Sequence, residues 1–304
     1  MKIMNRLMKI FYNPFWAFGV ILRRFISPYI KNDETFIKWE YFFGMYKMLN
    51  LKTPRTFNEK LQWLKLHDRR PEYIKMVDKS SAKYYVSELI GEEYVIPTLG
   101  IWNSFDEIDF NSLPNQFVLK CTHDSGGLVI CKDKSKLDKK AARKKIMASL
   151  KRNYYLEHRE WPYRDVPRRI IAEQFMVDES GTELKDYKIF CFHGEPQFIE
   201  VDYDRFVDHK LNVYDLDWKF IDFYMTSHND KNIHIARPKQ LEKMLDLART
   251  LTRNLIFARI DFYSINENLY FGEITLCPGC GMIDFHPKEF DEIIGKMLKL
   301  PINN

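Results

Sequence analysis

The segment from Arg259 to Gly281 constrains the fold more than any other part of this chain. Residues 258–265 and residues 269–275 read as two strands, separated by the polar, turn-prone Asn266-Glu267-Asn268. This pattern predicts a β-hairpin, because successive side chains of a strand point to opposite faces of the sheet. Asp261 and Glu273 then meet across the two strands, where two carboxylates repel each other unless a cation lies between them.

Magnesium is a common cation for such a pair, since it binds one or two carboxylates together with phosphate oxygens. We therefore expect Asp261 and Glu273 to hold Mg²⁺ beside a phosphate-bearing ligand. The alternative is a hairpin whose charged side chains face water. The second strand ends in Cys277-Pro-Gly-Cys280-Gly, a sharp turn at which a ligand can approach the backbone.

Composition narrows the class of protein. The 304 residues are 45% hydrophobic, which is enough for one large domain or for roughly two to three lobes. The net charge of +5 is mildly basic, which suits an anionic ligand and gives no indication of nucleic acid binding. Five cysteines, without a second C-x-x-C pair, predict neither a disulfide framework nor a metal site and favour a reducing cytoplasm.

Residues 1–32 differ from the rest of the chain because they are basic and aromatic, with no acidic residue before Asp33. The longest uncharged run, residues 10–22, has 13 residues and is shorter than the ~20 that a membrane-spanning helix needs. Two interpretations remain open. Such a segment can lie in the interface of a membrane, or it can form a helix that packs on the protein's own body.

A glycine-containing turn divides residues 116–132 into two predicted strands. Lys120 lies near the end of the first strand, and Ser125, Gly126 and Gly127 lie in the turn. Backbone N–H groups of such a turn can approach phosphate oxygens while a lysine supplies positive charge, so the segment predicts a phosphate-binding loop. An ordinary β-turn is the alternative.

Residues 169–177 form another predicted strand, and it contains Glu173 and Gln174 followed by Phe175. The acid and the amide can form hydrogen bonds with the edge of an adenine base, and Phe175 can supply backbone and apolar contacts. The alternative is an edge strand with outward polar residues. A later loop carries Arg205 and Lys210, which can meet a terminal phosphate or a substrate carboxylate; here the alternative is a charged surface loop.

These features, in this order, resemble the ATP-grasp superfamily. The resemblance lies in Val77-Asp-Lys-Ser-Ser-Ala-Lys83, Phe117–Lys120 with Ser125–Gly127, Ala172–Phe175, Arg259–Asp261 and Gly272–Gly279. More narrowly, the chain is similar to the TupA-like branch, which is found in bacterial surface-polysaccharide loci. That similarity lies in Thr56–Leu66, Gly100–Trp102, Arg159–Tyr163, Asp186–Lys188 and Tyr214–Trp218, and it extends over roughly residues 50–295.

The resemblance implies an α+β fold in which two α+β lobes clasp a nucleotide, preceded by an N-terminal helical extension. The implied divisions are residues 1–50 for the extension and 51–115 for an N-terminal helical region. Residues 116–176 then form the small lobe, or lid, and residues 177–304 the large lobe with the metal site.

The resemblance also implies ATP and Mg²⁺ as cofactors and assigns roles to individual residues. Lys79, Lys120 and the loop of Ser125, Gly126 and Gly127 would hold phosphates. Glu173, Gln174 and Phe175 would line the adenine, and Asp186 and Lys188 would also bind the nucleotide. Arg259, Lys210 and Arg205 would be catalytic, and Asp261, Glu273 and Thr275 would hold the metal. Thr275 stands where the superfamily usually has asparagine.

The implied activity is that of a ligase in bacterial surface-polysaccharide biosynthesis. It would activate a carboxylate, expected on a uronic acid, as an acyl phosphate for amide formation with an amino acid or another amine. Its partners would be ATP, the amine, and an acidic saccharide or lipid-linked glycan, without nucleic acid. Its location would be cytoplasmic and peripheral at the inner face of the membrane, where residues 1–32 would make the contact.

Other classes of function remain open from the sequence. A glycosyltransferase often carries a metal-binding Asp-x-Asp, and Asp202–Asp204 and Asp215–Asp217 match that spacing. A sugar kinase on the same fold would leave phosphate on its product. A non-catalytic assembly factor would bind only nucleotide and membrane.

Overall fold

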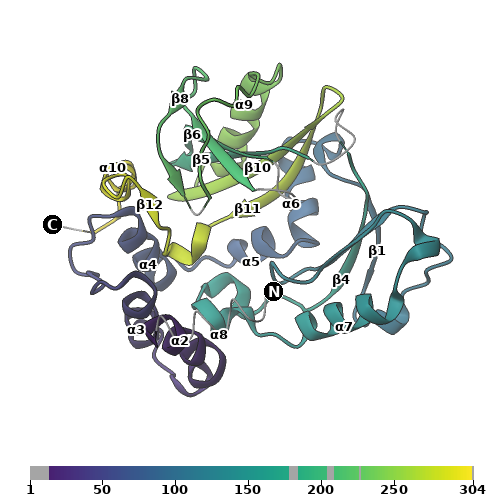
Figure 1. Cartoon of the computed structure of the whole chain (residues 1–304), viewed down its shortest axis with the longest axis horizontal. Helices are drawn as coiled ribbons and strands as arrows, with labels where there is room; N and C mark the ends of the chain where they lie inside the picture. Colours follow the sequence, from purple (N-terminus) through teal and green to yellow (C-terminus); the bar gives the residue numbers. More distant parts are fainter. Residues whose placement is uncertain (1–13, 178–183, 204–208, 226, 303–304) are drawn as a thin grey trace.

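The computed structural model describes residues 14–177, 184–203, 209–225 and 227–302, and within them α-helices pack on antiparallel sheets (Figure 1). The two α+β lobes that the sequence predicts are present. The larger sheet has the strand order β11-β10-β5-β6-β7-β8. Its strands are β5 (Asp186–Phe192), β6 (Glu195–Tyr203), β7 (Lys210–Tyr214), β8 (Phe220–Ile221), β10 (Phe257–Ile265) and β11 (Asn268–Thr275).

Helices cover both faces of the larger sheet. They are α9 (Leu241–Thr252) on one face, and α4 (Phe57–His67) and α10 (Phe290–Met297) on the other. Successive residues of β5 enter the two cores in turn, with Ile189 on the α9 side and Phe190 on the α4 side. Since side chains alternate along a strand, Asp186 and Lys188 share the face of Phe190 and lie beyond its aromatic core.

The smaller sheet has the strand order β1-β4-β2-β3. Its strands are β1 (Thr98–Trp102), β2 (Phe117–Cys121), β3 (Leu128–Cys131) and β4 (Ile170–Gln174). Helix α7 (Lys139–Leu150) covers one face through Ile146, which packs with Leu119 and Ala172. Alternation along β2 and β4 leaves Lys120 and Glu173 on the opposite face.

The N-terminal helical extension consists of α2 (Pro14–Ile21), the π-helix η1 (Leu22–Ile26), the short helix η2 (Ser27–Tyr29) and α3 (Asp33–Met45). Leu22, Phe36, Ile37 and Tyr41 form its small core. In the parts of the chain that the structure describes, no helix is long and apolar enough to cross a membrane. The remaining elements are α8 (Tyr154–His158), β9 (Tyr224–Met225), β12 (Phe285–His286), and the short helices η3 (Glu92–Tyr94), η4 (Phe105–Glu107), η5 (Lys134–Lys136), η6 (Trp161–Arg164) and η7 (Pro278–Gly281).

The sequence predicts that Asn58 caps the helix that follows it and that residues 73–90 form one helix, and both expectations are wrong. Helix α4 is capped by Thr56 rather than Asn58, because the Thr56 hydroxyl accepts a hydrogen bond from the Glu59 amide and the Glu59 carboxylate accepts one in return. The sequence of residues 73–90 predicts one helix, but the chain forms α5 (Glu72–Val77) and α6 (Ser81–Ile90). The break between them brings Lys79 into the space between the lobes.

Candidate functional site

The β10–β11 hairpin supplies the acidic side of the site. Its strands pair in the predicted register, with Asp261 opposite Glu273. The strict alternation expected along the second strand is interrupted, because the register shifts after Asp261 and leaves Gly272 without a partner. A Cβ atom at Gly272 would lie 3.1 Å from the Asp261 carbonyl oxygen, so this close approach of the two strands favours glycine.

Arg259 lies between the two acids. Its guanidinium group donates two hydrogen bonds of 2.7 Å to the Asp261 carboxylate, one of 3.0 Å to Glu273 and one of 3.1 Å to the Thr275 hydroxyl. The cation that the hairpin needs is therefore supplied in part by the chain itself. Asp261 is buried, whereas the side chain of Glu273 is 49% exposed.

The two acids differ in their electrostatics. Burial raises the pKa of Asp261, and the charge of Glu273 raises it further against the effect of Arg259. Burial also raises the pKa of Glu273, but Arg259 and Lys79 outweigh that effect, and its pKa is lowered. Glu273 is therefore the more firmly ionised acid, and it is the one that is accessible from the cleft.

The residues present fit Mg²⁺ that is shared with a phosphate-bearing ligand. The described residues include no group of three or more His, Cys, Asp or Glu side chains arranged to hold a metal ion on their own. Glu273 and Asp261 supply oxygen donors of the kind that Mg²⁺ prefers, and phosphate oxygens usually complete its coordination. Arg259 neutralises only part of the negative charge of the two carboxylates, so a bound cation could neutralise the remainder.

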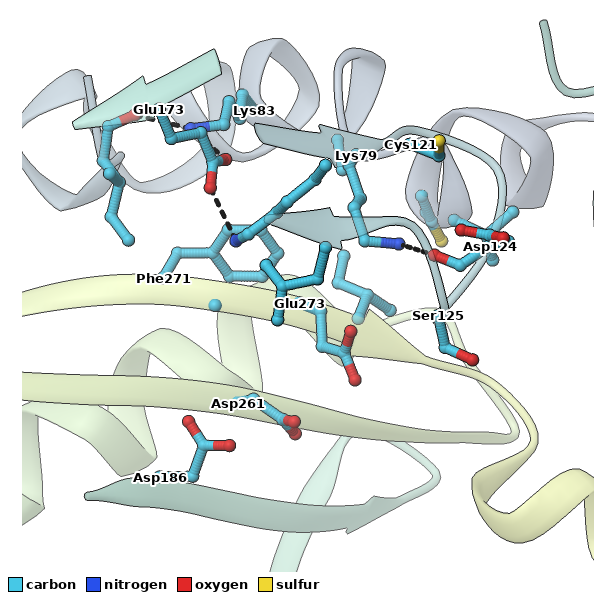
Figure 2. A pocket seen from close by; sticks show the side chains of 18 of the residues that line it. Lys79, Lys83, Cys121, Asp124, Ser125, Glu173, Asp186, Asp261, Phe271 and Glu273 are labelled. Atoms are coloured by element: carbon cyan, nitrogen blue, oxygen red, sulfur yellow. Dashed lines mark hydrogen bonds and ion pairs between the residues drawn. The ribbon is translucent and has the colours of Figure 1, made fainter. Parts of the chain in front are cut away.

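Two lysines, Lys83 of α6 and Lys120 of β2, converge on Glu173. Lys83, which Figure 2 shows beside Glu173, lies 2.7 Å from one of its oxygens. Lys120 lies 2.6 Å from the other oxygen. Burial raises the pKa of Glu173, but the two lysines outweigh it and lower the pKa to about 2. A buried carboxylate between two lysines holds both ammonium groups at the roof of the cleft.

The glycine turn has an arrangement that the sequence does not predict. The amides of Gly126 and Gly127 donate hydrogen bonds of 3.3 Å and 3.1 Å to the carboxylate of Asp124. The Ser149 hydroxyl bonds to the same carboxylate, and Lys79 donates to the Asp124 carbonyl oxygen. In this conformation those two amides therefore bind an anion that belongs to the loop itself.

A second mixed-charge group lies on β5 and β6, next to the hairpin. Lys188 donates hydrogen bonds to Glu200, at 2.9 Å, and to Asp202. In the adjoining loop, the ring of His209 lies 3.3 Å from Asp202. Asp186 is buried on the same face of the sheet as Lys188.

These groups line a cleft between the two sheets. A cavity of about 270 Å³ contains most of the charged side chains, and an adjoining cavity of about 1240 Å³ extends past the end of β4. Both cavities are lined by Lys120, Glu173 and Tyr263, so they lie side by side. Figure 2 places Lys79, Lys83 and Glu173 on one side of this space and Asp186 and Asp261 on the opposite side.

The structure brings most of the expected site residues together. The smaller cavity is lined by Lys79, Lys120, Ser125, Gly127, Glu173, Asp186, Lys188, Arg259, Asp261 and Glu273, and the larger one by Gln174 and Phe175. Gly126, Thr275 and Lys210 do not line either cavity, and Lys210 lies 3.4 Å from Asp230. Arg205 lies outside the described residues. The roles assigned to all of these side chains stay predictions.

The two Asp-x-Asp motifs lie in different surroundings. The carboxylate of Asp202 bonds to Lys188, and Asp204 lies outside the described residues. Asp215 and Asp217 belong to the turn between β7 and β8, where Asp217 pairs with Lys219 at 3.6 Å. The second motif does not line the cleft.

Sequence reasoning assigns no role to two residues that line the cleft. The first is Lys83, which lies in the motif that begins at Val77. Its spacing of four residues from Lys79 is the sequence feature that could have identified it. Tyr163 lines the cavity with Ser125 and Glu273, and its ring packs 4.6 Å from that of Tyr154. Burial raises the pKa of Tyr163 strongly, with a further contribution from Glu160, so its hydroxyl group stays protonated.

Tyr163 is held in place by contacts with distant parts of the chain. The segment that carries it, residues 154–164, is bound to the N-terminal extension through Arg159. This buried side chain donates hydrogen bonds of 2.7 Å to the Ser27 carbonyl oxygen and 2.9 Å to that of Ile30. The Tyr155 hydroxyl donates to Asp33 at 2.7 Å. One wall of the cleft is thus fixed to the first helices of the chain.

Two α+β lobes that face each other across a cleft lined by lysines and carboxylates define the ATP-grasp class. The family model described as TupA-like ATPgrasp matches residues 59–299, which is more than half of the chain. The chain therefore belongs to the TupA-like ATP-grasp family. A comparison with curated protein sequences found no match.

The comparison with solved structures gives distant similarities to ligases and a synthetase. D-alanine–D-alanine ligase from Bacillus anthracis, complexed with ATP, is 14% identical with a TM-score of 0.39, and the match covers 67% of this chain and 54% of that one. The Helicobacter pylori enzyme is 14% identical, with a TM-score of 0.44 and coverage of 82% and 68%. An ADP complex of N5-carboxyaminoimidazole ribonucleotide synthetase is 14% identical, with a TM-score of 0.41 and coverage of 72% and 50%. The chain spans about half to two thirds of the length of these proteins.

Proposed function

We propose that this protein is an ATP- and Mg²⁺-dependent ligase of bacterial surface-polysaccharide biosynthesis, which joins a carboxylate, expected on a uronic acid, to an amino acid or another amine. One observation carries the proposal. Lys79, Lys83 and Lys120 face Asp261 and Glu273 across a single cleft, so cations and carboxylates surround a space suited to a metal-bound polyphosphate.

The proposed reaction has two steps. A carboxylate oxygen of the acid attacks the γ-phosphorus of ATP, the bond to the bridging oxygen breaks, and ADP leaves. The amine nitrogen then attacks the carbonyl carbon of the acyl phosphate, inorganic phosphate leaves, and the amine loses a proton. Phosphorylation turns a poor leaving group into a good one, so the amide bond can form at neutral pH.

The residues of the cleft would divide the work between them. Lys79 and Lys120 would bind phosphate oxygens, while Glu173 would hold Lys120 in place and meet the adenine together with Gln174 and Phe175. Asp186 would bind the ribose. Mg²⁺ held by Asp261 and Glu273 would neutralise charge on the transferred phosphoryl group.

The remaining partners follow from charge and location. The excess of basic residues over the whole chain suits an acidic saccharide or a lipid-linked glycan as the acceptor. A lipid-linked acceptor would be met at the inner face of the cytoplasmic membrane, so we place the enzyme there as a peripheral protein.

The test is the release of ADP in the presence of Mg²⁺, measured with a panel of uronic acids, each with and without amino acids. We expect release that requires both an acid and an amine, together with a product whose mass corresponds to an amide. A product that retains phosphate would identify a kinase instead. Binding of ATP without any stimulation across a broad panel would contradict ligation.

The control variants come from the same hairpin. Glu273→Gln removes the accessible acid of the cleft, and Glu267→Gln changes an acid in the exposed turn, where it pairs with Lys239. Only the first change should abolish acid-dependent ADP release. Equal loss in both variants would indicate that the hairpin has lost its structure rather than its chemistry.

A further inference from the structure

A stripe of exposed apolar side chains runs along the first helices. Phe18, Ile21, Phe25 and Tyr29 are 38%, 45%, 62% and 84% exposed, respectively. They follow one another at intervals of three, four and four residues through α2, η1 and η2. These intervals place them on one face of the helical run, and the intervening Leu22 and Ser27 are fully buried.

Exposed apolar residues are concentrated in this part of the molecule. Of the seventeen large hydrophobic residues that are exposed in the described part of the chain, seven lie between residues 18 and 48. Besides the stripe they include Trp39, Tyr46 and Met48. A concentration of exposed apolar side chains of this kind points to an interaction site, whereas isolated exposed residues need no partner.

The charges around the stripe indicate an anionic partner. Arg24 and Lys31 are exposed beside it. The nearby acids are engaged, because Asp33 pairs with Arg69 at 2.8 Å, Glu34 pairs with Lys38, and Glu40 is buried against His158. Aromatic rings at an apolar face flanked by basic residues are typical of segments that lie in the interface of a membrane.

We propose that the face formed by Phe18, Ile21, Phe25 and Tyr29 docks on the surface of a bilayer that contains anionic lipids. The rings enter the boundary between headgroups and acyl chains, and Arg24 and Lys31 meet lipid phosphates. This proposal makes the peripheral location proposed above more specific. It rests on that part of the proposed function and on no other part. Its observations are independent of the reaction in the cleft.

The buried side of the same helices leads to the cleft. Arg159 binds the carbonyl oxygens of Ser27 and Ile30, which lie directly behind the stripe, and its own segment continues to Tyr163. Figure 1 shows α2 and α3 next to α8, the first helix of that segment. A docked stripe therefore holds the wall of the cleft that contains Tyr163 in a fixed relation to the membrane.

The experiment is co-sedimentation of the full-length protein with vesicles of pure phosphatidylcholine and with vesicles that also contain phosphatidylglycerol. We expect binding that requires the anionic lipid and weakens with added salt. The variant Phe25→Ser/Tyr29→Ser should reduce that binding about tenfold or more, since it removes the two most exposed rings. The control Tyr84→Ser removes an exposed ring from α6 and should bind as the wild type does.

Three outcomes would overturn the inference. The first is no binding to either kind of vesicle, and the second is binding that the double substitution leaves unchanged. The third is a dimer in solution that the double substitution dissociates, which would make a second copy of the chain the partner of the stripe. ADP release measured without vesicles reports on the proposed reaction alone, so failure of one proposal is distinguishable from failure of the other.

Discussion

Two parts of the cleft wall are built in different ways. In one part, Arg259, Asp261, Glu273 and Thr275 belong to a single hairpin and contact one another directly. In the other part, the segment that carries Tyr163 is held through Arg159, which bonds to a carbonyl group 132 residues away in the sequence. The first arrangement follows from strand periodicity and pairing, whereas the second depends on the packing of the whole chain. The contacts within the hairpin can therefore be predicted from the sequence pattern, whereas the position of Tyr163 cannot.

The largest effect should come from breaking the distant arrangement. Arg159→Ala leaves the carbonyl groups of Ser27 and Ile30 without their donor and removes a charge that lies 3.3 Å from Asp33. Loss of one partner from such a buried group destabilises by about 3–5 kcal/mol. Hydrogen exchange should therefore rise in residues 14–45 and 154–164. Arg164→Ala, in an exposed pair of the same segment, is the control and should leave exchange unchanged.

Substitution of an acid in the hairpin should reduce ATP turnover and leave the stability of the protein unchanged. Glu273→Gln removes a half-exposed carboxylate, so the protein should keep its melting temperature while ATP turnover falls on the order of 10²–10³-fold. Steady-state ADP release checks this. Full activity in the variant would mean that the acids of the hairpin serve only the fold.

A third comparison concerns Glu173, which is held by lysines from two separate elements. Its lowered pKa means that it stabilises the folded state above pH 4.5 and that this stabilisation is lost as the pH falls towards 2. The unfolding free energy of Glu173→Gln should be lower than that of the wild type by at most about 3 kcal/mol at neutral pH. The difference should shrink between pH 5 and 3 in denaturant titrations. Asp106→Asn removes a fully exposed carboxylate whose pKa is lowered by its hydrogen bond to Arg143, and it should show a much weaker trend because solvent screens the pair.

The smallest effects are expected from two substitutions in residues 154–164. One tests a role of this segment in the reaction, and the other tests its role in holding the structure together. Tyr163→Phe removes only the hydroxyl group of a residue that lines the cleft, and turnover should fall about tenfold without a change in stability. Tyr155→Phe removes the hydrogen bond to Asp33 and should lower stability by about 1 kcal/mol while turnover stays near wild type. If Tyr163→Phe lowered stability and left turnover unchanged, this segment would have a structural role only.

Much of this architecture follows from the sequence. The pairing of Asp261 with Glu273 requires only the period of two along each strand, and the structure confirms it. The lobes follow from motifs that the family shares. The side-chain contacts were less predictable. Part of the positive charge expected between the acids comes from Arg259, whose guanidinium group binds Asp261, two residues further along the same strand.

The contacts of Glu173 and Tyr163 show why the rest was not predictable. The carboxylate of Glu173 meets Lys83 and Lys120 because three elements, far apart in the chain, pack side by side. Nothing in the local pattern of β4 indicates that arrangement. Tyr163 follows a short helix with no apolar periodicity, so its position depends on the N-terminal extension.

The glycine turn has a consequence for ligand discrimination. Asp124 already occupies the amides of Gly126 and Gly127, so an incoming anion must displace this internal competitor before it can bind to them. If the cleft binds ATP as proposed, a single free phosphate would gain few contacts in that exchange. A nucleoside triphosphate would bring several anionic groups at once, and the contacts proposed for it with Lys79, Lys120 and Glu173 would favour the exchange. On that proposal, the turn would discriminate against small anions in favour of a multivalent ligand.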